Sequence, residues 1–258
     1  MKRKKKGLIK SVALVLAILT AVSGISLIFS NFGGGTSSSG NANVIEKNHV
    51  TKALSAVKYV AFGDSITYGV DGVDWVKMEK PYPTLVAERL GFASVDNRGV
   101  SGAMLAPRST GYCNMTQNIL SFSLPADIIS VMLGVNDYMQ NTPLGNMASR
   151  DNTTIYGSLH LIAEHLTKQY PDAFIFFMTP FETKNGTNNN VAGYNLEAVA
   201  LAVKSVANKY EIPVLDMYEN GKYSVEMNNS NSDGLHPSQS FHINYTAPKI
   251  CKFIKKNY

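Results

Sequence analysis

The stretch Asp127-Ile128-Ile129-Ser130-Val131-Met132-Leu133 decides the fold class. It is almost continuously apolar, without the alternation of a strand that has one wet face. Such runs are typical of strands that lie in the middle of a parallel sheet and are buried on both faces. Parallel neighbours need a crossover connection, which is usually a helix. We therefore expect a parallel sheet that is covered by helices on both faces.

Strand-like and helix-like patterns alternate on both sides of this run, which predicts an α/β domain of about five strands. The other expected strands are Val57–Phe62, Ser94–Asn97, Ala173–Met178 and Ile212–Met217. The expected helices are Tyr82–Leu90, Ile155–Tyr170 and Leu196–Tyr210, of which the first two are followed by the stop signals Gly91 and Pro171. The tail Ser238–Lys256 is expected to form a closing helix, although Pro248 interrupts its pattern.

The composition indicates one folded domain and argues against a nucleic-acid partner. The chain has 258 residues, of which 45% are hydrophobic and 17% charged, enough for one sizeable core. Its net charge is +5, but six basic residues lie within the first ten positions, which leaves about −1 for the rest. A nucleic-acid-binding domain needs a basic face of its own. We therefore expect no nucleic-acid binding.

The first 55 residues have the pattern of a leader and a tether. In residues 1–30, a lysine cluster precedes Ser11–Phe29, an uncharged apolar run that is long enough to cross a bilayer. This pattern predicts a signal peptide or an uncleaved membrane anchor, and the length of the run favours the anchor. Residues 31–55 are rich in Gly, Ser and Asn, like flexible linkers. We expect residues 56–258 to form the catalytic domain, outside the cell membrane.

Gly63-Asp64-Ser65 follows the first expected strand directly. Functional groups of open α/β sheets gather at the carboxyl ends of the strands, and Ser65 would lie there at the tip of a turn. A serine hydroxyl is a weak nucleophile unless a base is within hydrogen-bond reach and a third group orients that base. Taken alone, Gly-Asp-Ser is more often an ordinary turn or a helix cap.

Asp233-Gly234-Leu235-His236 supplies the groups that Ser65 lacks. A single turn can bring the Asp233 carboxylate to one ring nitrogen of His236, which leaves the other nitrogen to face Ser65. A histidine held in this way can take the serine proton and return it to a leaving group. An isolated Asp-x-x-His is more often a polar surface turn, but the two motifs complement each other.

Two further motifs follow expected strands and could stabilise an oxyanion. Leu133-Gly134-Val135-Asn136-Asp137 places the amide of Asn136 at the end of the most buried strand. A side-chain amide aimed at an oxyanion contributes about 3 to 4 kcal/mol to catalysis in known enzymes. The alternative role of Asn136 is to cap a helix or brace a turn. In Asn97-Arg98-Gly99-Val100-Ser101-Gly102, the backbone N–H of Gly102 could reach the same oxyanion.

Together, these four motifs resemble, in content and order, the motifs of the SGNH hydrolases, also called the GDSL esterase and lipase family. The resemblance spans about residues 59–237, with Ile66 where the family's name-giving motif has leucine. It implies a flavodoxin-like, three-layer α/β/α fold in which Ser65, His236 and Asp233 form the triad. It also implies an oxyanion hole made of the N–H groups of Ser65 and Gly102 and the side chain of Asn136. It implies no metal and no cofactor.

We therefore expect an extracytoplasmic serine esterase that hydrolyses carbohydrate O-acyl groups or lipid acyl esters through an acyl-enzyme. Its partners would be that ester and, through the N-terminal segment, the membrane. The alternatives are a glycan O-acyltransferase and a surface binding module that has lost catalysis.

Other residues leave their roles open. Five aromatic residues lie near the motif ends, where they could line an acyl or sugar pocket: Tyr68, Trp75, Tyr82, Tyr112 and Tyr138. Of these, Tyr68 and Tyr138 are the candidates for the substrate pocket, although core packing explains an aromatic residue equally well. Cys113 and Cys251 could form one disulfide or remain two small apolar side chains. His160 and His165 are five residues apart, a spacing that does not place two metal ligands on one helix face.

Overall fold

The computed structural model describes residues 52–107, 111–220 and 233–258 and contains one five-stranded parallel sheet in the order β2-β1-β3-β4-β5. The strands are β1 (Lys58–Gly63), β2 (Ser94–Gly99), β3 (Ile128–Met132), β4 (Phe174–Met178) and β5 (Val214–Leu215). The predicted leader and nearly all of the predicted linker lie outside the described residues. Among the helices that are described, none combines the length and the apolar character needed to span a bilayer.

Strand β3 (Ile128–Met132) shows why residues 127–133 are almost continuously apolar. All five of its residues are buried. Ile129 and Val131 belong to one hydrophobic cluster, whereas Ile128 and Met132 belong to another. Successive side chains of a strand point to opposite faces of the sheet, so each cluster takes alternate residues. The strand therefore has no face on which polar side chains would be expected.

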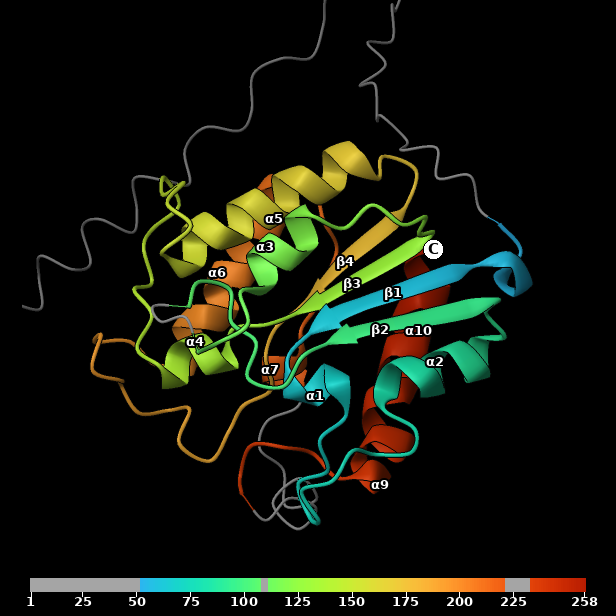
Figure 1. Cartoon of the computed structure of the whole chain (residues 1–258), viewed down its shortest axis with the longest axis horizontal. Helices are drawn as coiled ribbons and strands as arrows, with labels where there is room; N and C mark the ends of the chain where they lie inside the picture. The colour runs from blue at the N-terminus through green and yellow to red at the C-terminus, as the bar shows by residue number, and fades with distance from the viewer. Residues whose placement is uncertain (1–51, 108–110, 221–232) are drawn as a thin grey trace, which may run out of the picture. The chain divides into compact units, whose positions relative to one another are not determined.

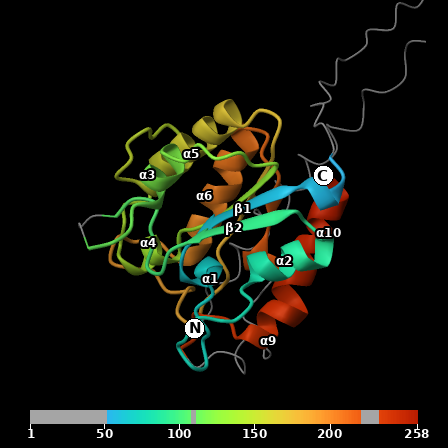
Figure 2. The ribbon, with the colours of Figure 1, turned by 45° about the vertical axis from the view of Figure 1, so that its right-hand side comes forward.

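Helices cover both faces of the sheet, which confirms the three-layer prediction (Figure 1). One face carries α3 (Met115–Leu120), α5 (Ile155–Gln169) and α6 (Leu196–Lys209). The other face carries α2 (Tyr82–Leu90) and α10 (Ala247–Asn257), which run side by side in both ribbon views (Figure 2).

Several short helices gather at the carboxyl ends of the strands. Helix α1 (Ser65–Tyr68) follows β1, and α4 (Val135–Met139) follows β3. Helices α7 (Met217–Asn220) and α9 (Gln239–Phe241) lie at the same end (Figure 1). At the amino end of β1, the 3-10 turn Leu54–Ala56 precedes the strand. Strand order reverses between β1 and β3, and this switch point is where open α/β sheets form their functional crevice.

Two expected elements differ from the structure. The fifth strand was expected over Ile212–Met217 but contains only Val214–Leu215. It ends early because the hydroxyl of Thr179 accepts hydrogen bonds from the backbone N–H groups of Met217 and Tyr218, at 2.7 and 2.9 Å, and α7 begins there.

The expected closing helix is divided into three segments. Helix α9 passes into a π-helical turn, His242–Thr246, and then into α10. Pro248 lies in the first turn of α10, where a backbone N–H has no helical partner, so this proline begins the helix and does not break it.

The end of β2 packs against α1 at a distance that only glycine permits. A Cβ atom on Gly99 would lie 2.2 Å from the backbone nitrogen of Tyr68. The side chain of Asn97 holds the same junction, because its amide donates to the carbonyl of Thr67 (2.8 Å) and its oxygen accepts from the N–H of Gly99 (2.9 Å). The loop after β2 is thereby fixed beside the helix that begins with Ser65.

Candidate active site

Ser65 is the first residue of α1, and one residue separates it from the end of β1. The preceding residue, Asp64, caps this helix, since its carboxylate accepts a hydrogen bond from the N–H of Ile66 at 3.0 Å. Both Ser65 and Asp64 are buried. Burial raises the pKa of the Asp64 carboxyl to about 7, against the opposing effect of the Ile66 N–H. The cap fixes the turn that presents the serine hydroxyl.

His236 bridges Ser65 and Asp233. Its Nε2 atom lies 2.8 Å from Oγ of Ser65, and its Nδ1 atom lies 2.6 Å from Oδ2 of Asp233. The three side chains come from opposite ends of the domain sequence, with 171 positions between the serine and the histidine. The structure thus brings the nucleophile, base and orienting group named from the sequence into one hydrogen-bonded line.

The carboxylate of Asp233 also organises its own turn. Its Oδ1 atom accepts from the backbone N–H groups of Leu235 and His236, at 2.8 and 2.9 Å. Partial burial works to raise the pKa of Asp233, but the hydrogen bonds from His236 and Leu235 outweigh it and hold this pKa below its usual value. The group next to Nδ1 is therefore an ionised carboxylate at neutral pH, which favours a proton on Nδ1 and leaves Nε2 to face the serine.

Asn136, in helix α4, lies beside the loop that contains Gly102. The amide nitrogen of Asn136 donates one hydrogen bond, at 3.0 Å, to the carbonyl of Ala103. Ala103 is the residue after Gly102. An amide NH₂ carries two protons, so a second donor remains on this nitrogen. In the described part of the chain, no turn or loop hydrogen bond uses the N–H of Ser65 or Gly102. These donors are available to an oxyanion.

Asp137 is a site residue to which the sequence analysis gave no role. It is fully buried, and its two carboxylate oxygens accept from the backbone N–H groups of Leu105 and Ala106, at 2.9 and 3.0 Å. Burial raises its pKa to about 6, although both N–H donors oppose this shift. Asp137 ties the loop that contains Gly102 to the helix that carries Asn136. Its position directly after Asn136 in the motif was the only signal in the sequence.

The two tyrosines proposed from the sequence differ in their surroundings. Tyr138 is 7% exposed, and its hydroxyl lies 2.7 and 2.9 Å from the carbonyl oxygens of Asn185 and Asn188. These contacts brace that loop, and a role of Tyr138 in the substrate pocket stays a prediction. Tyr68 is half-buried at the end of α1, and the ammonium group of Lys77 lies 4.2 Å from its ring centroid.

Trp75 is an aromatic residue that contacts His236. Its ring lies 5.7 Å from the His236 ring in an edge-to-face arrangement, and 60% of the residue is exposed. Trp75 was one of the five aromatic residues near the motif ends but was not chosen as a pocket candidate, because nothing in the local pattern placed this loop beside a histidine 161 positions away.

The remaining sequence candidates do not join the site. Cys113 and Cys251 are both free thiols, the first half-buried and the second buried. Within the described ranges, no group of three or more His, Cys, Asp or Glu side chains could hold a metal ion. His160 is buried and contacts the carbonyl of Met147 at 3.0 Å.

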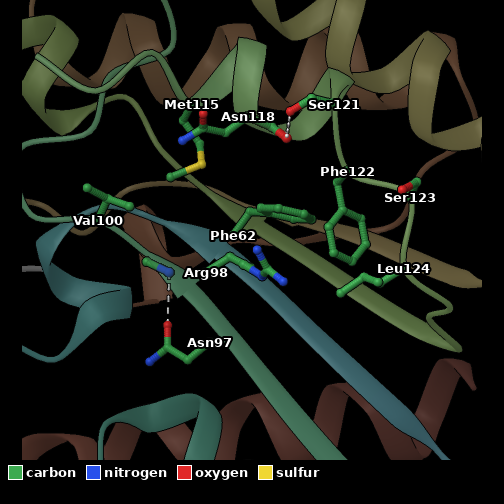
Figure 3. Close-up of a pocket in the computed structure, with 11 residues that line it drawn as sticks. Phe62, Asn97, Arg98, Val100, Met115, Asn118, Ser121, Phe122, Ser123 and Leu124 are labelled. Atoms are coloured by element: carbon green, nitrogen blue, oxygen red, sulfur yellow. Dashed lines mark hydrogen bonds between the residues drawn. The ribbon is translucent and has the colours of Figure 1, made fainter.

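A separate pocket lies beside β2, on the face that carries α3 (Figure 3). Its volume is about 510 Å³. The guanidinium of Arg98 lies 5.3 Å from the ring centroid of Phe122 and pairs with Asp96. Neither Ser65 nor His236 lines it. This pocket is therefore distinct from the hydrogen-bonded line of Ser65, His236 and Asp233, although the pocket and Ser65 both lie near the end of β2.

This fold and this arrangement define a class of three-layer α/β/α proteins that carry a serine, a histidine and an aspartate in one hydrogen-bonded line at the carboxyl edge of a parallel sheet. The comparison with family models identifies the group within that class: residues 61–242 match the GDSL-like lipase/acylhydrolase family. The chain belongs to this family and is an enzyme of the hydrolase type, which confirms the resemblance seen in the sequence.

Solved structures agree with this assignment. A possible lipase from Chitinophaga pinensis is 27% identical, with a TM-score of 0.62 over 78% of this chain and 98% of that one. A protein from Lactobacillus plantarum is 25% identical, with a TM-score of 0.68 over 79% and 99%. A carbohydrate acetylesterase family member from Sinorhizobium meliloti is 18% identical, with a TM-score of 0.55 over 78% and 98%, and shares the fold. No curated protein matches.

Proposed function

We propose that this chain is a serine esterase that works through a Ser65–His236–Asp233 triad and an acyl-enzyme. The observation that carries the proposal is the continuous line from Ser65 Oγ to His236 Nε2 (2.8 Å) and from His236 Nδ1 to Asp233 (2.6 Å). Both distances are within the reach that general-base catalysis requires.

In the first half of the reaction, Ser65 Oγ attacks the ester carbonyl carbon while its proton passes to Nε2 of His236. The carbonyl electrons move onto oxygen, and the oxyanion is stabilised by the N–H groups of Ser65 and Gly102 and the amide of Asn136. When this tetrahedral intermediate collapses, the bond to the alcohol breaks. The alcohol leaves with the proton from Nε2, and the acyl group stays on Ser65.

In the second half, water gives a proton to Nε2 and its oxygen attacks the acyl-enzyme carbonyl. Collapse of the second intermediate releases the carboxylic acid and returns the proton to Ser65 Oγ. A sugar hydroxyl in place of water would make the same site a glycan O-acyltransferase. The nature of the acceptor separates hydrolase from transferase, and the family match to lipases and acylhydrolases favours water.

The substrate we propose is a carboxylic ester with a carbohydrate or lipid component. Support comes from structural neighbours whose names include a carbohydrate acetylesterase and a lipase/acylhydrolase. We further propose that the enzyme acts outside the cytoplasm, either secreted or held at the cell membrane by its N-terminal segment. The support for this location is the lysine cluster followed by the apolar run Ser11–Phe29.

Hydrolysis of short-chain and long-chain aryl esters by the full chain and by Ser65→Ala tests the proposal. We expect the parent to release acid from at least one ester and Ser65→Ala to lose that activity, with the unfolding transition unchanged. A Ser65→Ala variant as active as the parent would contradict the triad. A product in which an added sugar carries the acyl group, formed faster than free acid, would favour the transferase.

A further inference from the structure

Residues 70–77, which we call the Trp75 loop, hold an exposed indole against the catalytic histidine. Trp75 is 60% exposed, and Val76 beside it is 58% exposed. The indole and the imidazole of His236 meet edge to face with a centroid distance of 5.7 Å. A large apolar side chain exposed at a reaction centre indicates a surface that contacts a ligand.

The backbone of Trp75 has an unusual conformation that its loop maintains. Its φ is 59°, in the left-handed region that bulky side chains rarely adopt. The N–H of Trp75 donates to the carbonyl of Asp71 (3.0 Å), and the N–H of Asp71 donates to the carbonyl of Val76 (2.8 Å). Strained conformations of this kind persist where the surrounding structure enforces them, and they concentrate at functional sites.

Asp71 fastens this loop to the segment that follows His236. Asp71 is buried, and one of its carboxylate oxygens accepts from the N–H of Val73 at 2.7 Å. The other oxygen accepts from the N–H of Gln239 at 2.9 Å, three positions after the histidine. The N–H of Gly72 also donates to the carbonyl of Pro237, at 3.4 Å. The indole and the imidazole are thus held on one connected unit.

The position of Trp75 determines which half of an ester it meets. The oxyanion donors lie on the loops after β1, β2 and β3, whereas the departing oxygen must approach Nε2 of His236 to receive its proton. The alcohol part of the ester therefore lies on the histidine side, where the indole is. We propose that Trp75 is the wall of the subsite for the leaving alcohol and that this alcohol is the pyranose ring of an O-acylated sugar.

The composition of the loop favours a sugar over a lipid. Two exposed residues of opposite charge, Asp74 and Lys77, flank the apolar pair Trp75 and Val76. A pyranose has an apolar C–H face that can lie on an indole and a rim of hydroxyls that can bond to such charges, whereas an alkyl chain offers these charges no hydrogen bond. This substrate class rests on the proposed esterase function.

Acetate esters that share the acyl group and differ in the alcohol test the proposal. Each variant is compared with the full-length parent on the same ester, so the intrinsic reactivity of that ester cancels. Trp75→Asn removes the indole and tolerates the positive φ, and Trp75→Phe restores a flat ring. We expect Trp75→Asn to lower kcat/KM roughly tenfold for mono-acetylated methyl glucoside, mainly through KM, and less than about twofold for ethyl acetate. Trp75→Phe should recover most of the loss.

Val76→Ala is the matched control, because Val76 is equally exposed, has no ring contact with His236 and keeps its backbone bond to Asp71. It should leave both esters unaffected. Equal losses on both esters in Trp75→Asn would overturn the proposal, since they would mean that the indole only positions His236. Hydrolysis of ethyl acetate by the parent, without hydrolysis of the sugar acetate, would also overturn it and leave the esterase function intact. If the parent hydrolysed no ester, the proposed function itself would be wrong.

Discussion

The loop that carries His236 and the helical turn that carries His242 place two histidines six positions apart in opposite environments. Both rings are buried, with exposures of 8% and 0%, and each lies beside an aromatic ring, Trp75 or Tyr82. His236 has a hydrogen-bond partner at each ring nitrogen. His242 accepts only the N–H of Tyr82 at its Nδ1 atom (3.1 Å), and its Nε2 atom has no partner among the described residues.

The difference shows that burial does not make a histidine a base. Burial lowers the pKa of His242 to about 3, and the charge of Asp71 only partly opposes this shift. The ring of His242 therefore stays neutral as part of the core. His236 has the Asp233 carboxylate on one side and a hydroxyl on the other, so a proton that arrives on Nε2 creates an imidazolium with a counter-charge at hydrogen-bond distance.

The same substitution at both positions should give the largest contrast. His236→Asn removes the base, and we expect kcat to fall by at least about a thousandfold. His242→Asn keeps an acceptor for the N–H of Tyr82 and should leave kcat within about twofold, because His242 does not contact Ser65. Ester hydrolysis at neutral pH measures both. Comparable activity losses in the two variants would mean that the two histidines do not differ in the way we describe.

Asp233→Asn tests whether the carboxylate distinguishes the two histidines. The amide preserves the shape of the side chain but can donate to Nδ1, which would place the ring proton on Nε2, where it blocks uptake of the serine proton. We expect kcat to fall roughly 10³- to 10⁴-fold. A fall of less than tenfold, in a variant that unfolds like the parent, would show that His236 does not depend on this carboxylate.

Asn136→Ala tests the proposed oxyanion donor next to Ser65. This change removes the side-chain donor and its bond to the carbonyl of Ala103, and we expect kcat to fall about 10²- to 10³-fold with a smaller change in KM. A loss confined to KM would instead assign Asn136 to ground-state binding. The unfolding midpoint measured beside the kinetics separates either outcome from a displaced loop.

The smallest expected effect is on stability. Below a pH of about 6.5, the unfolded chain takes up a proton at His242, whereas the folded chain resists until about pH 3. Folding stability from this residue is therefore lost as pH falls through that window, by about 2 kcal/mol at pH 5. Denaturant unfolding should show the parent losing about this much more than His242→Asn between pH 7 and 5. A difference between the two proteins that does not change with pH would contradict the lowered pKa.

The sequence predicted the fold well where apolar patterns are long. The run at residues 127–133 identified β3, and the other four strands lie within or overlap the ranges predicted for them along the chain. The short helices α1, α3, α4 and α7 were missed, because four to six residues are too few to show helical periodicity. The end of β5 was misplaced because it depends on the hydroxyl of Thr179, the residue that follows the neighbouring strand β4.

The contacts of the site also fall into those that the sequence predicts and those that it does not. Asp233 and His236 are three positions apart, so their contact follows from one turn, and the sheet delivers Ser65 to the same edge. The contact between Trp75 and His236 could not be predicted, because it depends on a left-handed backbone and on the bond between Asp71 and Gln239, 168 positions apart. Long-range contacts between loops leave no periodic signal in a sequence.

The most direct test of the central claim, that His236 activates Ser65, is covalent labelling with a fluorophosphonate followed by intact-mass and peptide analysis. We predict one adduct on the peptide that contains Ser65, much slower labelling of His236→Asn, and labelling of His242→Asn at the parent rate. A label on another residue, or a His236→Asn variant that labels as fast as the parent, would contradict the account.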